Sequence, residues 1–235
     1  MQDLSTAIII FSRHNSTRLP GKALELINGR EMLGWVIDRA KLVDKDIPVI
    51  VATSVERQDD QIAEFSQSNG VFCFRGDLNN VLKRAIDTCK AFKIDAFARV
   101  CGDRPFFSPE LTLSGFRQIK QSRAELISSQ IGQCLPPGLT TEIVQLSALE
   151  KIATMSQNKD DLEHITRFIY NHKSAFDIRE FELHKPIKHW ANLVVDDKYE
   201  LERARWIAVK VAKSYKASFC HEKVLYYAKE YDRSV

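Results

Sequence analysis

Long apolar runs and charge of one sign are both missing from this sequence of 235 residues. No stretch of about 18 apolar residues occurs, which argues against a membrane-spanning helix. The 34 basic and 31 acidic side chains leave a net charge of only +3, too small to indicate a nucleic-acid-binding protein. The amino terminus has neither the basic start nor the cleavage site of a signal peptide. We therefore expect a cytoplasmic protein that needs neither membrane nor nucleic acid.

Clustered metal-binding or nucleophilic residues are missing as well. The five cysteines are scattered, and not even the nearest two, Cys89 and Cys101, form a C-x-x-C pair. This spacing predicts buried or half-buried thiols in a reducing compartment, with no disulfide framework and no zinc site. The six histidines contain no H-E-x-x-H pair, and no G-x-S-x-G motif suggests a hydrolase.

What is present is an ordinary globular composition, with 44% hydrophobic and 28% charged residues, and a regular alternation of patterns. Short apolar runs rich in β-branched residues predict strands, and apolar positions at helical spacing predict helices between them. The expected strands are 7–11, 48–52, 71–74 and 95–101, and the expected helices begin at residues 31, 61, 81 and 109. The alternation predicts an α/β fold, with a mostly parallel sheet flanked by helices.

The second half of the chain is less regular. We expect further strands at 125–129, 142–146 and 190–195, and helices at 149–155, 162–172 and 198–215. The turn at Pro136-Pro137-Gly138 is the best boundary inside a single domain of residues 1–235, between a core at 1–135 and an elaboration at 136–235. We expect the three tryptophans to serve core packing rather than base stacking, and Tyr226 and Tyr227 to lie in the core or on a dimer surface.

A basic loop follows the first predicted strand. Residues 12–22 read Ser-Arg-His-Asn-Ser-Thr-Arg-Leu-Pro-Gly-Lys, with cations at Arg13, Arg18 and Lys22. Ligands of open parallel sheets bind at the carboxyl ends of the strands, where Gly21 would let the backbone approach a phosphate. The loop is not a Walker A motif, because Ala23 follows the lysine. The pattern favours a polyphosphate site, and a solvated basic turn is the alternative.

Carboxylates follow two other predicted strands. Asp103 comes directly after the strand at 95–101, and Asp196 and Asp197 follow the strand at 190–195. Carboxylates at strand ends can hold a divalent cation on a substrate phosphate, but Asp is also common in turns and as a helix N-cap. Together with the basic loop, they indicate metal-assisted nucleotidyl transfer, provided that Asp103 and Asp196 lie within about 8 Å of each other.

The basic loop resembles the A-R-x-x-S-T-R-L-P-G-K signature of the cytidylyltransferases that activate acidic sugars. The sequence is similar to the family of spore coat polysaccharide biosynthesis protein F, related to the 3-deoxy-manno-octulosonate and acylneuraminate cytidylyltransferases. Further motifs of these families match in the correct order: Arg75-Gly76 with Val81-Leu82, Gly102-Asp103-x-Pro105, Gly138 with Glu142, Glu163-His164-Ile165-Thr166, and Val195-Asp196.

The resemblance implies a Rossmann-like nucleotidyltransferase (GT-A-like) fold that transfers CMP from CTP, with Mg²⁺ as cofactor. The acceptor would be an acidic sugar or a phosphorylated compound, in surface polysaccharide biosynthesis, and relatives often form homodimers. The implied catalytic residues are Arg13, Lys22 and Asp103. The implied nucleotide-binding residues are Arg13, Ser16, Arg18, Gly21, Lys22, Arg75 and Asp103, in the core at 1–135. The implied metal ligands are Asp103 and Asp196, and the implied acceptor-binding residues are Gly138, Glu142 and His164.

The acceptor side departs from the family pattern, because Pro137 and Thr140 replace aspartates of the usual motif. His164 could equally be a helical histidine hydrogen-bonded to a neighbour. Two alternatives therefore stay open: a transferase that uses GTP or another nucleotide with a sugar phosphate, and a nucleotide-binding protein without turnover. A glycosyltransferase would be favoured by a D-x-D motif after a predicted strand, and the sequence has none there.

Overall fold

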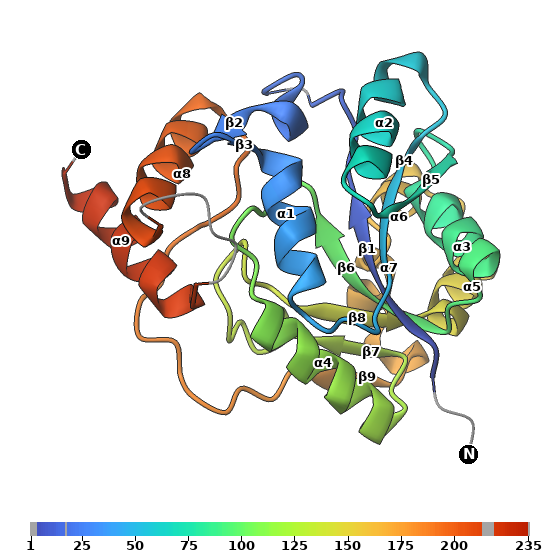
Figure 1. Ribbon diagram of the computed structural model, residues 1–235. Coiled ribbons are helices and arrows are strands. Elements are labelled where there is room, and N and C mark those ends of the chain that lie inside the picture. Colours follow the sequence, from blue (N-terminus) through green and yellow to red (C-terminus); the bar gives the residue numbers. More distant parts are fainter. Residues whose placement is uncertain (1–3, 17, 213–218, 235) are drawn as a thin grey trace.

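The computed structural model describes residues 4–16, 18–212 and 219–234, and within them the predicted sheet is present (Figure 1). Its seven strands lie in the order β5-β4-β1-β6-β8-β7-β9. The strands β5, β4, β1 and β6 run parallel, whereas β8 runs antiparallel to both of its neighbours. The strand bounds are Thr6–Phe11 (β1), Val49–Ser54 (β4), Phe72–Gly76 (β5), Ala96–Cys101 (β6), Leu126–Ser128 (β7), Glu142–Gln145 (β8) and Ile178–Glu180 (β9).

Helices cover both faces of the sheet. One apolar cluster joins the sheet to α1, α2, α4, α8 and α9, and a second joins its other face to α3, α5 and α7. The helix bounds are Met32–Lys41 (α1), Asp60–Ser68 (α2), Val81–Phe92 (α3), Pro109–Ser122 (α4), Leu146–Met155 (α5), Lys159–Glu163 (α6), Arg167–Asn171 (α7), Lys198–Val211 (α8) and His221–Ser234 (α9). Three 3-10 turns span Lys22–Leu24 (η1), Arg57–Asp59 (η2) and Lys173–Ala175 (η3).

The strand β1 shows why this sequence forms a sheet covered on both sides. Successive side chains of a strand point to opposite faces, so Ile8 and Ile10 enter the first apolar cluster and Ala7 and Ile9 the second. All four are fully buried, and each isoleucine contributes about 2 kcal/mol of burial free energy. The unbroken apolar run at 7–10 is therefore the sequence signature of a central strand.

The chain connections place the functional edge between β1 and β6. From β1 the chain crosses to β4 and β5 on one side, and it then returns to β6 on the other side of β1. In open α/β sheets such a reversal of strand order leaves a crevice at the carboxyl ends of the two central strands. The loops that follow β1 and β6 lie at this crevice, and they carry the basic loop 12–22 and Asp103.

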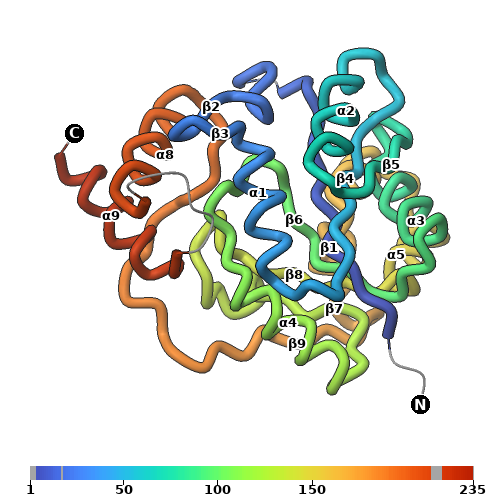
Figure 2. The backbone as a smooth tube through the Cα atoms, viewed as in Figure 1, coloured from blue at the N-terminus to red at the C-terminus, as the bar shows by residue number. Residues whose placement is uncertain are grey.

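A small hairpin was not predicted, and it lies next to α8, the helix expected to begin at residue 198. β2 (Leu26–Ile27) and β3 (Arg30–Glu31) form an antiparallel pair, and both turn residues between them, Asn28 and Gly29, have positive φ. Figure 2 shows α8 between this hairpin and α9. Arg205 of α8 donates a hydrogen bond to the carbonyl oxygen of Leu26, at 2.8 Å. Pairs of two residues are too short to give a periodic signal.

Three predicted elements differ from the structure. The helix expected at 162–172 is interrupted, because His164 leaves the helical region with φ −106° and ψ 80° and separates α6 from α7. The strand expected at 190–195 is an extended segment outside the sheet, although Val195 donates a hydrogen bond to the carbonyl oxygen of Asp103. The helix expected at 198–215 ends at Val211, and positions 213–218 lie outside the described residues.

Some burial expectations also need correction. Trp35 is fully buried as expected, but Trp190 is 55% exposed and therefore contributes little to the core. The cysteines are all free thiols, and Cys220 is exposed rather than buried. No helix among the described residues is both long and apolar enough to cross a membrane.

Candidate active site at the strand reversal

A cavity of about 390 Å³ opens at the carboxyl ends of β1 and β6. The loop after β1 forms one wall with Arg13, Ser16, Arg18 and Lys22, and Asp103 follows β6 at the floor. The amino-terminal part of α3, the end of α6, Arg99 of β6 and Asp196 also line the cavity. The cavity therefore brings together residues from distant parts of the sequence, including seven of the predicted site residues: Arg13, Ser16, Arg18, Lys22, Asp103, His164 and Asp196.

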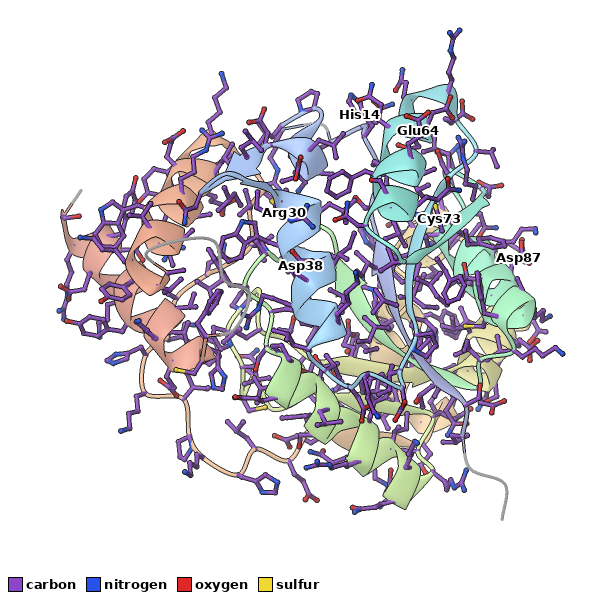
Figure 3. The ribbon with its side chains drawn as sticks, in the orientation of Figure 1. His14, Arg30, Asp38, Glu64, Cys73 and Asp87 are labelled. Carbon is purple, nitrogen blue, oxygen red and sulfur yellow. The ribbon has the colours of Figure 1, made fainter. Side chains whose placement is uncertain are left out.

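The basic loop is held in place by buried polar contacts. The backbone N–H of His14 donates a hydrogen bond to Oδ1 of Asp59, at 2.6 Å, and the N–H of Ser54 donates to Oδ2, at 3.0 Å. Burial alone would raise the pKa of Asp59, but these hydrogen bonds outweigh it and lower the pKa. Figure 3 shows His14 near helix α2, which follows Asp59. Gly21, with φ 74°, bends the loop so that its N–H reaches the carbonyl oxygen of His14.

Lys22 lies at the centre of the charged groups. Its Nζ donates hydrogen bonds to Oδ2 of Asp103 at 2.9 Å, to Oδ1 of Asp196 at 2.8 Å and to the carbonyl oxygen of Val195 at 3.0 Å. Burial would lower the pKa of Lys22, but the two carboxylates outweigh burial and raise the pKa above its ordinary value. Lys22 is therefore a charged ammonium group held between two carboxylates.

The two carboxylates are close enough to share one small cation. Their oxygens contact the same Nζ, so they are separated by less than the sum of those two distances, which is well below the limit of about 8 Å. In the parts of the chain that the structure describes, no cluster of three or more His, Cys, Asp or Glu side chains is arranged as a metal site. Asp103 and Asp196 are the side chains that could hold a divalent cation here, together with phosphate oxygens and water.

Asp196 and Asp197 have different surroundings. Asp197 is the N-cap of α8, where its Oδ1 accepts a hydrogen bond from the backbone N–H of Glu200 at 2.9 Å. Asp196 turns to the cavity, where Oδ2 contacts Arg18 at 2.6 Å and Oδ1 contacts Lys22. Burial would raise the pKa of Asp196, but these two cations outweigh it and lower the pKa. One aspartate thus caps a helix and leaves the other available for a ligand.

The break between α6 and α7 supplies a second wall. Glu163 pairs with Arg13, at 2.9 Å, and both side chains are partly exposed. His164 also lines the cavity, so the interruption of the predicted helix is what places it there. Arg13 and Glu163 thus connect the basic loop to the opposite side of the cavity.

Four predicted site residues do not line this cavity as the structure describes it: Gly21, Arg75, Gly138 and Glu142. Arg75 pairs with Asp60 at 2.6 Å and donates a hydrogen bond to the carbonyl oxygen of Ser54. Gly138, with φ 89°, packs so tightly against Leu193 that a Cβ there would lie 2.6 Å from the Cβ of Leu193. Glu142 is buried beneath Arg99.

Two arginines of the cavity were not predicted. Arg84 of α3 is 2% exposed, and its Nε has no hydrogen-bond partner among the described residues. Burial and the nearby charge of Arg13 lower the pKa of Arg84. Arg99 of β6 pairs with Glu142. The sequence signal for Arg99 was a charged residue inside an otherwise apolar strand, because burial of a charge is costly unless the charge is paired or functional.

The site and the fold can be compared with known proteins. A family model for cytidylyltransferases matches residues 7–231. Spore coat polysaccharide biosynthesis protein SpsF of Bacillus subtilis is 30% identical over 179 residues, 74% of this chain and 73% of that relative. A 3-deoxy-manno-octulosonate cytidylyltransferase of Fusobacterium nucleatum is 32% identical over 116 residues, 49% of this chain and 46% of that relative.

The solved structure of a cytidylyltransferase from Leptospira borgpetersenii superposes with a TM-score of 0.88 and 25% sequence identity, covering 98% of this chain and 96% of that chain. The agreement confirms the predicted Rossmann-like nucleotidyltransferase fold. Because the family model covers almost the whole chain, this protein belongs to the cytidylyltransferase family.

Proposed function

We propose that this chain is a Mg²⁺-dependent enzyme that transfers CMP from CTP to an acidic sugar or a phosphorylated acceptor and releases pyrophosphate. The observation that carries the proposal is the contact of Lys22 with both Asp103 and Asp196 at the strand reversal. Two relatives, one a polysaccharide biosynthesis protein and one a 3-deoxy-manno-octulosonate cytidylyltransferase, support this choice of acceptor and pathway.

Asp103 and Asp196 would hold the Mg²⁺. When bound, the ion neutralises phosphate charge and orients the triphosphate for in-line attack. The two carboxylates are partly exposed, 23% and 28%, so a hydrated ion has access to them. With these two carboxylates as its protein ligands, the ion would keep coordination positions for phosphate oxygens of the nucleotide and for water.

The cations of the cavity would bind the triphosphate. Lys22 would exchange its carboxylate contacts for phosphate oxygens, and Arg13 and Arg18 would do the same from the neighbouring loop positions. The unpaired Nε of Arg84 adds a buried donor at the same cavity. An oxygen of the acceptor would form a bond to the α-phosphorus while the bond to the bridging oxygen of pyrophosphate breaks, and an attacking anomeric hydroxyl would give its proton to water. These cations would stabilise the charge that develops on the leaving pyrophosphate.

Pyrophosphate release tests the proposal directly. The protein is incubated with Mg²⁺ and CTP, GTP, UTP or ATP, against 3-deoxy-manno-octulosonate, N-acetylneuraminate and sugar 1-phosphates. We expect release with CTP and one acceptor, loss of release in Asp103→Ala, and normal release in Lys90→Met, which removes an exposed cation of α3 remote from the cavity. Release with GTP and a sugar 1-phosphate instead would replace the proposed donor. Binding of CTP without release from any acceptor would favour a binding protein.

A further inference from the structure

Arg99 begins a row of polar side chains that crosses three neighbouring strands at the functional edge. Because β8 runs antiparallel to β6, its first residue, Glu142, lies beside the carboxyl end of β6. Nη1 of Arg99 donates a hydrogen bond to Oε2 of Glu142, at 2.7 Å. On the next strand, Ser128 of β7 is the register partner of Glu142. The row lies between the cavity and the interior of the sheet.

The inner end of this row is sealed, in the sense that it is buried away from water and from the cavity. The Glu142 side chain is fully buried, and its second oxygen accepts a hydrogen bond from the Tyr170 hydroxyl at 2.5 Å. Since that hydroxyl gives its one proton to Glu142, it accepts the hydrogen bond from Ser128, at 2.6 Å. Burial opposes ionisation of Glu142, but the Arg99 charge and these hydrogen bonds outweigh burial and lower its pKa. The carboxylate is therefore charged, and Arg99 and Tyr170 hold its two oxygens.

The outer end of the row is open. The Arg99 side chain is 18% exposed and lines the cavity. A guanidinium group has five N–H donors, and among the described residues only Glu142 accepts a hydrogen bond from Arg99. The remaining donors are in a fixed orientation because Glu142 holds one side of the planar group. Such a fork matches a carboxylate or a phosphate with two parallel hydrogen bonds.

A purely structural role does not explain this arrangement well. A buried ion pair gives little net stability, because the cost of desolvating both charges cancels most of the attraction. Apolar side chains at positions 99 and 142 would continue the pattern of β6 and β8 without that cost. The arrangement instead fits a binding group held by its neighbours: Glu142 is buried and fixes Arg99, and Arg99 reaches the cavity.

We propose that Arg99 binds the anionic group of the acceptor, a carboxylate or a phosphate, and that Glu142, Tyr170 and Ser128 are positioning residues that hold Arg99. This inference rests on the proposed function and narrows its acceptor to compounds with such a group. Arg99 precedes Asp103 by four residues, at most about 13 Å of extended strand. A single sugar with its attached acid group can span from Arg99 toward the α-phosphate of a nucleotide near Asp103.

Titration calorimetry in the presence of CMP tests the inference, with 3-deoxy-manno-octulosonate, glucose 1-phosphate and neutral glucose as probes. We expect the wild type to bind one charged probe and not glucose, and that probe identifies the group as carboxylate or phosphate. Arg99→Met should weaken this binding about tenfold to hundredfold, and Arg99→Lys should recover part of it. The rise in melting temperature that CTP causes should stay unchanged in all variants. Lys90→Met is the matched control for loss of one positive charge.

The double variant Arg99→Met with Glu142→Gln separates binding from folding. It removes both charges of the buried pair, so we expect a melting temperature near that of the wild type and binding as weak as in Arg99→Met. Wild-type affinity in either methionine variant would overturn the inference. Binding of glucose as tight as that of the charged probes would overturn it too, and so would a wild type that responds to CTP but binds neither charged probe. Absence of any CTP response would defeat the proposed function alone, because Arg99-dependent binding of a charged sugar would still stand.

Discussion

Two groups of charges lie at the same edge of the sheet, and they differ in their access to water. Lys22, Asp103 and Asp196 come from three separate loops, and the two carboxylates are 23% and 28% exposed. Arg99 and Glu142 come from neighbouring strands, and the carboxylate is fully buried. The first group has accessible partners that a ligand can replace. The second group has a partner that no ligand can reach.

This difference separates two uses of an ion pair. The carboxylates of the first group keep contact with water, so Lys22, itself 12% exposed, can leave Asp103 and Asp196 for phosphate oxygens that also carry negative charge. A buried pair is costly to break, because the remaining charge has neither water nor partner. We therefore expect changes in the first group to affect catalysis and changes in the second group to affect both folding and acceptor binding.

Replacement of Asp103 should give the largest effect on activity. Asp103→Asn keeps the shape of the side chain but removes the charge that would hold the metal, so we expect kcat for pyrophosphate release to fall at least about a thousandfold. The melting temperature should change little. Steady-state kinetics and thermal unfolding of the same preparation check both statements. A large loss of stability together with unchanged kcat would reverse the roles that we assign to the two groups.

Replacement of Arg99 should give the largest effect on stability. Arg99→Met leaves Glu142 buried without its cation, and we expect a loss of about 3 kcal/mol in the free energy of unfolding. Urea unfolding measures it. The additional Glu142→Gln change should restore most of the loss, because the unpaired charge is then gone. If the double variant is no more stable than the single variant, the pair is not the source of the effect.

Much of the fold could be predicted from the sequence, for a physical reason. Central strands and amphipathic helices have long periodic patterns, and the helix predicted at 81–92 coincides with α3. A short alternating pattern, in contrast, does not show whether a segment joins the sheet. The extended stretch at 190–195 alternates like a strand because Leu193 and Val195 are buried, yet it pairs only through single backbone hydrogen bonds to Pro137 and Asp103.

The candidate site was predictable where a loop follows a strand, and less so elsewhere. The basic loop, Asp103 and Asp196 lie together because the strand reversal brings their loops together. Arg84 and Arg99 were missed because they lie inside a helix and a strand that were interpreted only as core elements. Glu142 was recognised by its motif, but its position beneath Arg99 depends on the antiparallel direction of β8, which sequence patterns did not indicate.

Acid should remove the contribution of the buried Glu142 charge to stability. The pKa of Glu142 in the folded protein lies below its ordinary value of 4.5, so its charge stabilises the fold above that pH. This contribution is lost as the pH falls through the lowered pKa of the folded state. Glu142→Gln should lose about 2 kcal/mol at pH 7, where the wild type keeps its charged hydrogen bonds. The difference in melting temperature between the two proteins should shrink from pH 5 to pH 3, and a constant difference would contradict the lowered pKa.

The smallest effect concerns Asp197, and its replacement tests whether the group of Lys22, Asp103 and Asp196 ends at Asp196. Asp197→Ala removes the N-cap of α8 and should cost about 1 kcal/mol of stability, measured by urea unfolding, with kcat unchanged. Asp196→Ala should do the reverse, because that side chain contacts Lys22 and Arg18 instead of a helix end. The two adjacent substitutions remove the same chemical group one residue apart. If Asp197→Ala lowered kcat as much as Asp196→Ala does, the metal and triphosphate site would include Asp197 at the helix end as well as Lys22, Asp103 and Asp196.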